Sequence, residues 1–219
     1  MITAVLFDLD ETLHDRSASL RDFLISQHER HLAGCCSLEM FMECFVRLDA
    51  HGSLPKTSLY PRLLSELGVT NVNALMLAED YAAQFHQYAR HMDGAMPLLH
   101  ALRQQGMKLA IITNGSTGFQ LSVSAALRFT EFVDLVMVSD AEGLRKPDPR
   151  IFLLAAGRLE TPPSACLFVG DNPEADVQGA NAVGMHAVWF RRSIAWPPTL
   201  APVGKAIDEL GQVLELLAS

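Results

Sequence analysis

The chain has 219 residues, 49% of them hydrophobic, and a formal net charge of −8 at pH 7. This length allows one large domain, or one domain with a smaller insertion, and the acidic balance argues against a general nucleic-acid binder, which needs a basic surface. The sequence has no signal-peptide pattern, no apolar run long enough to span a membrane, and no metal or disulfide spacing among its four cysteines. We therefore expect a cytoplasmic protein that binds neither nucleic acid nor membrane.

The first predicted element is a short apolar run, Ala4 to Phe7, that leads directly into Asp8 and Asp10. Such a run is typical of a buried parallel strand, and open α/β sheets bind ligands at the carboxyl ends of their strands. Because strand side chains alternate between faces, both carboxylates would lie on one face. They would repel each other unless a cation lies between them or one keeps its proton. A pair of solvated turn acids fits this stretch alone almost equally well.

Residues 17–90 show only helical periodicity, with apolar residues repeating at i, i+3 and i+4. No strand-like run interrupts this segment, so the pattern predicts a small α-helical bundle inserted into the chain. Four helices are predicted around Leu20–Leu24, Leu38–Leu48, Leu59–Leu67 and Leu75–Phe85. The predicted domains are accordingly residues 17–90 for the bundle, and residues 1–16 with 91–219 for the remainder.

From residue 95 onward, helical patterns alternate with short apolar runs that read as strands. This alternation is typical of right-handed βαβ units and a parallel α/β sheet. A helix is predicted to end at Gly106, and a final amphipathic helix is predicted from Ile207 to Leu217. The predicted strands are Lys108–Thr113, Phe132–Val138, Cys166–Val169 and His186–Phe190.

Polar side chains follow several of these strands at the point where each ends. Taken singly, each has an ordinary explanation: Thr113 could cap a helix, Lys146 could be a surface lysine, and Asp171 could be a turn residue. Asp176 could be a first-turn acid that complements a helix dipole. A parallel sheet gathers the carboxyl ends of its strands at one edge, however, so their joint occurrence favours a shared site.

In four motifs the chain resembles the haloacid dehalogenase-type hydrolases, a superfamily of aspartate-nucleophile phosphatases. The resemblance implies a Rossmann-like parallel sheet with the strand order 5-4-1-2-3, in which Asp8 follows the central strand. It also implies that the inserted helical bundle is a cap domain. The motifs are Asp8-Leu9-Asp10-Glu11-Thr12, Thr113-Asn114-Gly115, Lys146-Pro147, and Gly170-Asp171-Asn172 followed by Asp176.

The resemblance implies the catalytic roles. Asp8 would attack phosphorus and become an aspartyl-phosphate, and Asp10 would protonate the leaving oxygen and later deprotonate the attacking water. Lys146 would offset the negative charge of the phosphoryl group. The residues expected to bind the phosphoryl group are Thr113, Asn114, Gly115 and Lys146.

The resemblance also implies a Mg²⁺ ion, which takes hard oxygen ligands and only one or two carboxylates. The expected ligands are the carboxylates of Asp8 and Asp171 and the backbone carbonyl of Asp10. A divalent cation and a lysine would remove most of the repulsion between an anionic nucleophile and an anionic phosphate. The side chains expected to support these ligands are Asp176, Thr12 and Asn172, with Asp176 orienting Lys146 or a metal-bound water.

The resulting prediction is a phosphatase for a small phosphorylated metabolite, acting as a monomer or homodimer. The alternatives on the same fold are a 2-haloacid dehalogenase, which Asp10 disfavours because a halide leaves without a proton, and a phosphosugar mutase. A non-catalytic binding protein is disfavoured by the intact set of acids.

Specificity is expected to come from the cap. His14, Asp15 and Arg16 follow the catalytic loop closely enough to line the cavity, and Arg47 and Lys56 could reach an anionic substrate or be solvated. Any cap movement is expected to hinge at Asp15–Ser17 and His91–Gly94.

Overall fold

The computed structural model describes residues 1–202 and 204–218. The described chain divides into two compact units: an α/β unit formed by Met1–Arg16 and the chain from Arg90 onward, and a helical unit, Ser17–Ala89. The chain thus leaves the α/β unit after its first strand and returns to it some 70 residues later.

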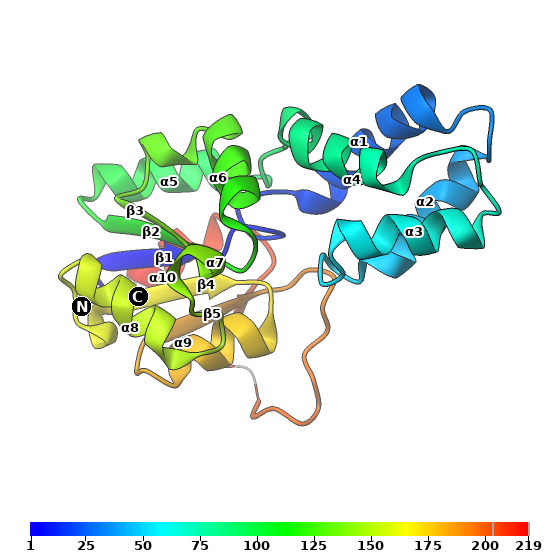
Figure 1. The fold of residues 1–219 in the computed structure, drawn as a ribbon. Helices are drawn as coiled ribbons and strands as arrows, with labels where there is room; N and C mark the ends of the chain where they lie inside the picture. Colours follow the sequence, from blue (N-terminus) through cyan, green and yellow to red (C-terminus); the bar gives the residue numbers. More distant parts are fainter. Residues whose placement is uncertain (203, 219) are drawn as a thin grey trace. The chain divides into compact units, whose positions relative to one another are not determined.

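Among the described residues, the α/β unit contains one sheet of six strands: β1 (Ala4–Phe7), β2 (Lys108–Thr113), β3 (Leu135–Val138), β4 (Cys166–Gly170), β5 (His186–Phe190) and β6 (Lys205–Ile207). Their order is β3-β2-β1-β4-β5-β6, and every neighbouring pair is parallel (Figure 1). Phe7, the last residue of β1, lies opposite Ile111 on one side and Val169 on the other. Read in the opposite direction, the observed order is β6-β5-β4-β1-β2-β3. It contains the predicted order 5-4-1-2-3 and differs from it only by β6 at the edge.

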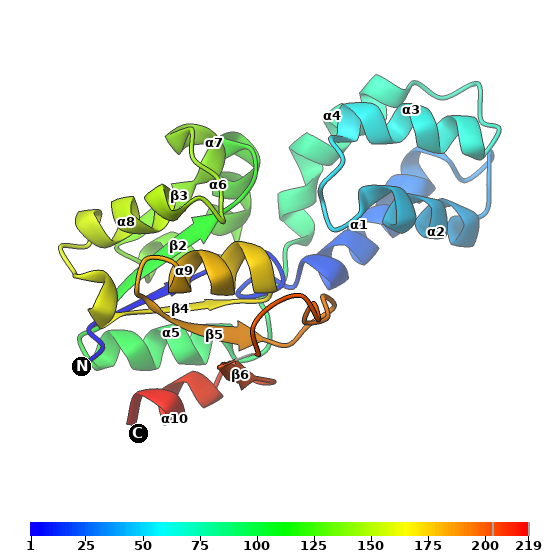
Figure 2. The same ribbon diagram turned by 90° about the horizontal axis from the view of Figure 1, so that it is seen from below.

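Helices cover both faces of this sheet. They are α5 (Ala95–Gln104), α6 (Thr117–Ala126), α7 (Ser139–Glu142), α8 (Pro149–Arg158), α9 (Gly179–Asn181) and α10 (Gln212–Ala218), with the short segments η2 (Phe129–Glu131), η3 (Pro163–Ala165) and η4 (Pro173–Gln178). α8 and α9 lie on one side of the sheet, and α5 and α10 lie on the other (Figure 2). On the α8 side, Leu6, Ile112 and Phe168 pack with Phe152 in a fully buried cluster. This two-sided cover explains why β1 is apolar and buried at all four positions.

Two predicted elements differ from the structure. Only the second half of the predicted strand 132–138 is extended, because pairing with β2 begins at Leu135, while Phe132 instead meets the ring of His100 edge-on. The predicted helix from Ile207 was wrong at its start, because Ile207 pairs with Phe190 and extends the sheet. The edge strand β5 offers unpaired backbone groups, and the short strand β6 pairs with them. β6 has only three residues, which are too few to show the alternation of apolar and polar side chains that is typical of a strand.

The helical unit contains α1 (Arg16–His31, which begins at the junction), α2 (Leu38–Asp49), α3 (Lys56–Glu66), α4 (Ala74–Gln84) and η1 (Phe85–Tyr88). Its core is aromatic: Phe23, Phe45 and Tyr81 meet at ring-centroid distances of 5.1 Å (Phe23–Tyr81) and 6.2 Å (Phe45–Tyr81). The cations predicted as possible substrate contacts already have carboxylate partners inside this unit. Lys56 Nζ lies 2.6 Å from Asp49 Oδ1, and Arg47 pairs with Glu66.

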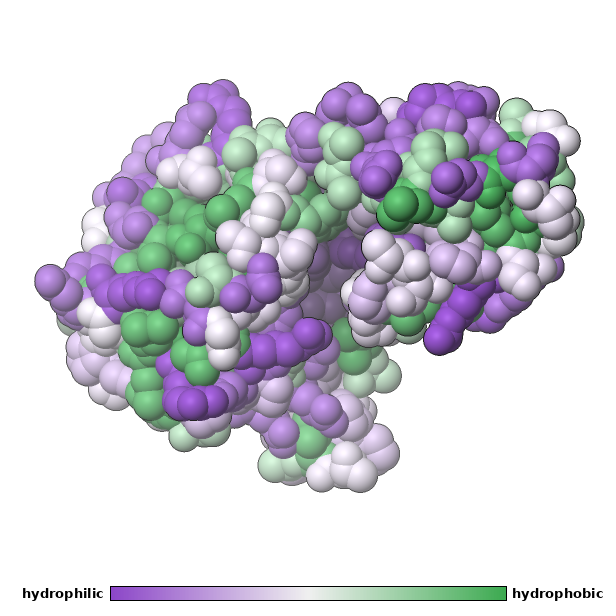
Figure 3. All heavy atoms as spheres, in the orientation of Figure 1, coloured by the Kyte–Doolittle hydropathy of each residue, from purple (hydrophilic) through white to green (hydrophobic). Residues whose placement is uncertain are grey.

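On the face that Figure 3 shows, apolar residues lie in small groups among polar ones. Large apolar side chains that remain exposed include Leu121 on α6 and Leu153 on α8. No helix within the described residues combines the length and apolar character needed to cross a membrane.

Candidate active site

Asp8 follows the last residue of β1, in the interior of the sheet. Its backbone N–H donates to the carbonyl of Val169 (2.9 Å), which continues the strand ladder past Phe7 and fixes the start of the loop. Its side chain is almost completely buried; Lys146 Nζ lies 2.6 Å from Oδ1, and the hydroxyl of Thr12 lies 3.4 Å from Oδ2. The predicted nucleophile and the predicted phosphate-binding lysine are therefore in direct contact.

Lys146 is held in place from two sides. The side chain of Asn114 spans its main chain, accepting from the N–H and donating to the carbonyl at 3.0 Å each. The ammonium group donates to Asp8 and also to Asp176 Oδ1, at 2.7 Å. Burial disfavours the charge, but Asp176 and Asp8 outweigh burial and raise the pKa of Lys146, which stays cationic. The side chain of Asn114 thus positions Lys146. Phosphate binding by Asn114 stays a prediction, and it would use the backbone of Asn114 because the side chain is occupied.

Asp171 and Asp176 come from the loop after β4 and from η4. Asp176 is buried, and its Oδ2 accepts from the backbone N–H of Asn172 at 2.9 Å. The side chain of Asn172 caps η4 by accepting from the N–H groups of Glu174 and Ala175. A side chain at Gly170 would collide with the carboxylate of Asp176, so the glycine in this motif makes room for that carboxylate.

Asp8, Asp171 and Asp176 form a buried cluster in which one carboxylate oxygen from each lies within 4.8 Å of the others. Burial, opposed by Lys146, raises the pKa of Asp8 to about 7. Burial and the neighbouring carboxylates raise the pKa of Asp171 to about 9. One lysine therefore does not balance three acids, and a bound cation would remove the remaining repulsion. The cluster could hold a metal ion, and its donors are the hard oxygen ligands that Mg²⁺ and Ca²⁺ prefer.

Asp10 lies in a different environment from Asp8. His14 Nδ1 is 2.7 Å from its Oδ1, and the amide of Gln120 donates to its Oδ2 at 3.0 Å. Burial raises the pKa of Asp10, but the hydrogen bonds and the nearby charge of Arg16 outweigh burial and lower the pKa to about 2. Two carboxylates two residues apart thus have pKa values shifted in opposite directions, that of Asp8 upward and that of Asp10 downward.

The predicted phosphate-binding segment Thr113–Gly115 lies at the end of β2, next to β1. Thr113 is buried, and the N–H of Gly115 donates to the hydroxyl of Ser139 at 3.0 Å. Ser139 follows β3, so three neighbouring strands contribute to this edge of the sheet. The structure brings the predicted residues of all four motifs to this edge, whereas Arg47 and Lys56 belong to the helical unit.

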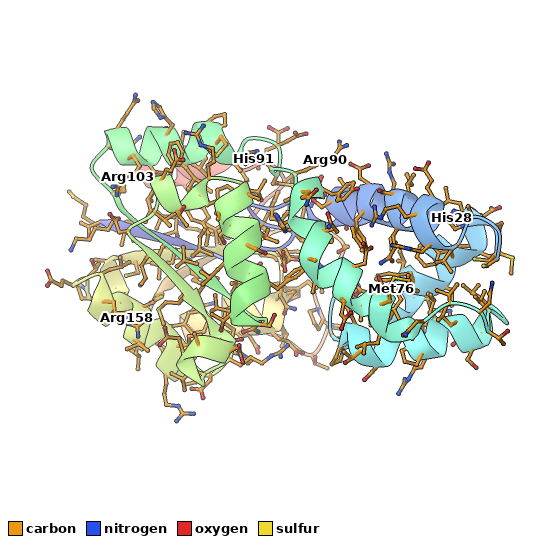
Figure 4. All side chains as sticks on the ribbon, turned by 45° about the horizontal axis from the view of Figure 1, so that its top comes forward. His28, Met76, Arg90, His91, Arg103 and Arg158 are labelled. Atoms are coloured by element: carbon orange, nitrogen blue, oxygen red, sulfur yellow. The ribbon has the colours of Figure 1, made fainter. Side chains whose placement is uncertain are left out.

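Each predicted hinge segment, Asp15–Ser17 and His91–Gly94, has a backbone hydrogen bond to a residue just before the other segment. Asp15 N–H donates to the carbonyl of Arg90, and Met92 N–H donates to the carbonyl of Leu13, at 2.9 and 2.8 Å. The side chain of His91, labelled with Arg90 in Figure 4, lies 2.9 Å from the carbonyl of Leu127. The outgoing and returning segments therefore form one short paired region within the α/β unit.

Sequence reasoning missed three contacts of the predicted site residues, those made by Gln120, Ser139 and His14. The contact of Gln120 with Asp10 joins residues 110 positions apart, and no spacing indicates it. Ser139 directly follows the predicted strand Phe132–Val138, and its contact with the N–H of Gly115 was not predicted. His14 was expected near the cavity, and its spacing of four residues from Asp10 gave no sign of their hydrogen bond.

The known proteins that this chain is similar to are hydrolases. The family model of the haloacid dehalogenase-like hydrolases matches residues 2–184. A ribulose-1,5-bisphosphate 5-phosphatase of Halopiger xanaduensis is 32% identical, with all of both chains covered. A glyceraldehyde 3-phosphate phosphatase of Methanopyrus kandleri is 32% identical over 88% of this chain and 85% of its own. Among solved structures, a 2-haloacid dehalogenase from Pseudomonas syringae is 30% identical with a TM-score of 0.63, covering 100% of this chain and 99% of its own.

Proposed function

Because the chain belongs to the haloacid dehalogenase-like hydrolases, we propose that it is a Mg²⁺-dependent phosphatase that hydrolyses a phosphomonoester of a small metabolite. The observation that carries the proposal is the buried contact of Lys146 with Asp8, beside Asp171 and Asp176, at the carboxyl end of an interior strand. This arrangement supplies a carboxylate nucleophile, a fixed cation and further oxygen donors in one place.

Asp8 is the proposed nucleophile. One of its carboxylate oxygens attacks phosphorus, the bond to the leaving oxygen breaks, and an aspartyl-phosphate forms. Water then hydrolyses this acyl phosphate to phosphate and regenerates Asp8. The cation of Lys146 at 2.6 Å stabilises the negative charge of Asp8 and of the approaching phosphoryl oxygens. Because the pKa of Asp8 is raised to about 7 in the protein alone, additional positive charge is needed to keep it ionised at neutral pH.

That charge is the proposed role of Mg²⁺. The ion would be held by the carboxylates of Asp8 and Asp171 and the backbone carbonyl of Asp10. When bound, Mg²⁺ offsets the charge of the carboxylates and of the phosphoryl oxygens. Asp176 already accepts a hydrogen bond on each oxygen, from Lys146 and from the N–H of Asn172. We therefore expect Asp176 to orient Lys146 rather than to bind the ion.

Asp10 is the proposed acid and base. Its lowered pKa keeps it ionised in the free enzyme, which suits its removal of a proton from the attacking water. The earlier step needs the protonated acid, which delivers its proton to the leaving oxygen. An arriving phosphate dianion raises the pKa of a neighbouring carboxyl group, so substrate binding favours uptake of that proton. Thr113 and the backbone N–H of Asn114 are the proposed phosphate-binding groups. The N–H of Gly115 donates to Ser139, so Gly115 would bind phosphate only by exchanging Ser139 for it.

The relatives favour a sugar phosphate as substrate, since one is a ribulose-1,5-bisphosphate 5-phosphatase and another is a glyceraldehyde 3-phosphate phosphatase. A phosphate-release screen over sugar phosphates, phosphoglycolate, phosphoserine and nucleoside monophosphates tests the proposal, run with Mg²⁺ and with EDTA. We expect Mg²⁺-dependent release from one class of metabolite. Release that EDTA leaves unchanged would contradict the metal assignment.

A 2-haloacid dehalogenase is the second candidate, because the Pseudomonas syringae enzyme is 30% identical over the whole chain. That reaction displaces halide from carbon and needs no acid for the leaving group, whereas Asp10 here is held by two hydrogen bonds beside the nucleophile. A halide-release assay with 2-chloropropionate separates the two activities. A phosphosugar mutase would use the same residues, and it would yield an isomeric sugar phosphate instead of free phosphate.

A further inference from the structure

We propose that His14 and Gln120 are positioning residues that fix the orientation of the Asp10 carboxylate for proton transfer, and that Gly115 is required because it leaves room for Gln120. The inference deepens the proposed phosphatase function and rests on it. It adds two residues that lie outside the four motifs of the family resemblance.

His14 holds the first oxygen of Asp10 from within the same loop. Its side chain is fully buried, and Nδ1 lies 2.7 Å from Asp10 Oδ1. The loop between them is closed by backbone hydrogen bonds, from the N–H of Glu11 to the carbonyl of His14 and from the N–H of His14 to the carbonyl of Leu9, at 2.8 Å each. His14 also forms an antiparallel bridge with His91. The imidazole is therefore placed by a rigid backbone, which is what a positioning role needs.

Gln120 holds the second oxygen from α6. Its Nε2 is 3.0 Å from Asp10 Oδ2 and 3.2 Å from the carbonyl of Asn114, and the side chain is 3% exposed. Both of these neighbours are acceptors only, so the NH₂ group of the amide must face them. Gln120 thus ties Asp10 to the loop that is proposed to bind the phosphoryl group.

Gly115 provides independent support, because its missing side chain leaves the space that Gln120 uses. A Cβ atom at this position would lie 2.7 Å from Nε2 and 2.9 Å from Cγ of Gln120, closer than real contacts allow. Any larger residue would push the amide away from Asp10. The glycine in the Thr113-Asn114-Gly115 motif of this chain therefore has a steric role as well as any role in binding phosphate.

With both oxygens of Asp10 bound, the plane of its carboxylate is fixed. The side chain keeps 25% of its surface exposed, so one side of the group remains open to a leaving oxygen or a water. Proton transfer needs a short, aligned contact between the two oxygen atoms, and misplacement by about 1 Å can reduce a rate by roughly 100-fold. Loss of either hydrogen bond would let the carboxylate rotate while leaving Asp8 and Lys146 in place.

The test compares the two chemical steps in Gln120→Met, which keeps the size of the side chain and removes the donor. With p-nitrophenyl phosphate, whose leaving group needs no proton, the rate of the p-nitrophenolate burst should stay within about threefold of wild type. With an alkyl phosphate, kcat should fall by about 10- to 100-fold with KM nearly unchanged. Gln104→Met, the same exchange at an exposed position of α5, is the matched control and should change neither rate.

His14 is tested by rescue. Asparagine can place an amide N–H close to the position of Nδ1, whereas leucine cannot donate, so His14→Asn should retain most of the alkyl phosphatase activity that His14→Leu loses. If the leucine variant does not fold, the two-substrate comparison on Gln120→Met still decides. Equal losses on both substrates, or a change in KM alone, would overturn the positioning role. A wild-type enzyme that hydrolyses neither phosphate ester would instead overturn the proposed function itself.

Discussion

Replacing Lys146 by methionine should destabilise the metal-free protein strongly. The ammonium group is buried and lies 2.6 Å from Asp8 and 2.7 Å from Asp176. At an effective dielectric constant of about 20, each contact corresponds to roughly 6 kcal/mol of attraction before desolvation costs. Removing one partner of a buried ion pair typically costs about 3–5 kcal/mol, because the remaining charge is buried without compensation. We expect a loss of this size for Lys146→Met at pH 8.

The assay is urea unfolding of wild type and variant, with EDTA and with Mg²⁺, at pH 8 and at pH 5. The loss should be smaller with Mg²⁺, because the ion replaces part of the missing charge. The loss of stability should also be smaller at pH 5. At that pH the buried carboxyl groups of the variant, which lack the ammonium group of Lys146, take up protons and no longer repel one another. Lys205→Met, the same exchange at an exposed position of β6, is the control, and we expect a change within about 0.5 kcal/mol. Equal losses for the two variants, unaffected by Mg²⁺ or pH, would refute the charge balance described for this site.

Three further predictions concern the same edge of the sheet. Asp8→Asn should abolish turnover, a loss of at least about 10³-fold, without lowering the Tm, because it removes a buried acid whose pKa is raised. A phosphate-release assay checks the activity and circular dichroism checks the Tm. A variant with full activity would exclude Asp8 as nucleophile. Asp10→Asn should slow alkyl phosphates by about 10²–10⁴-fold and affect the p-nitrophenolate burst much less, whereas equal losses on the two would argue against the acid role. The folded-state pKa values of Asp8 and Asp171 are raised from 3.8 to about 7 and 9. The folded metal-free protein therefore binds more protons than the unfolded chain, and it loses stability as pH rises from about 4 to 9. The gain in Tm from Mg²⁺ should be larger at pH 8 than at pH 5, and an equal gain at both would show that the ion binds elsewhere.

The parts of the fold that sequence predicts well are those fixed by pattern and topology. The apolar run before Asp8 has one stable location, a covered interior strand, and parallel strands must bring their carboxyl ends together. That rule alone predicts that Asp8, Thr113 and Asp171 share an edge. The contact of Lys146 with Asp8 needed the family resemblance, because Lys146 lies in a loop and not at the end of a strand.

The parts that sequence does not predict depend on contacts without a period. Gln120 reaches Asp10 from a helix whose apolar pattern gives no reason to single out one glutamine. β6 was missed because a three-residue strand has no measurable alternation, and its pairing with β5 depends on the free edge of the finished sheet. The glycines at 115 and 170 look like ordinary turn residues in the sequence, and only the structure shows that each leaves space for a particular side chain.

The central claim is that Asp8 itself receives the phosphoryl group, and trapping the intermediate tests it most directly. Enzyme turning over its best substrate with Mg²⁺ is quenched in acid and reduced with borohydride, which converts an aspartyl-phosphate to homoserine, and the peptides are analysed by mass spectrometry. The account predicts homoserine at position 8 in wild type, with no conversion in Asp8→Asn. Homoserine at another aspartate, or a stoichiometric burst of product with position 8 unmodified, would contradict it.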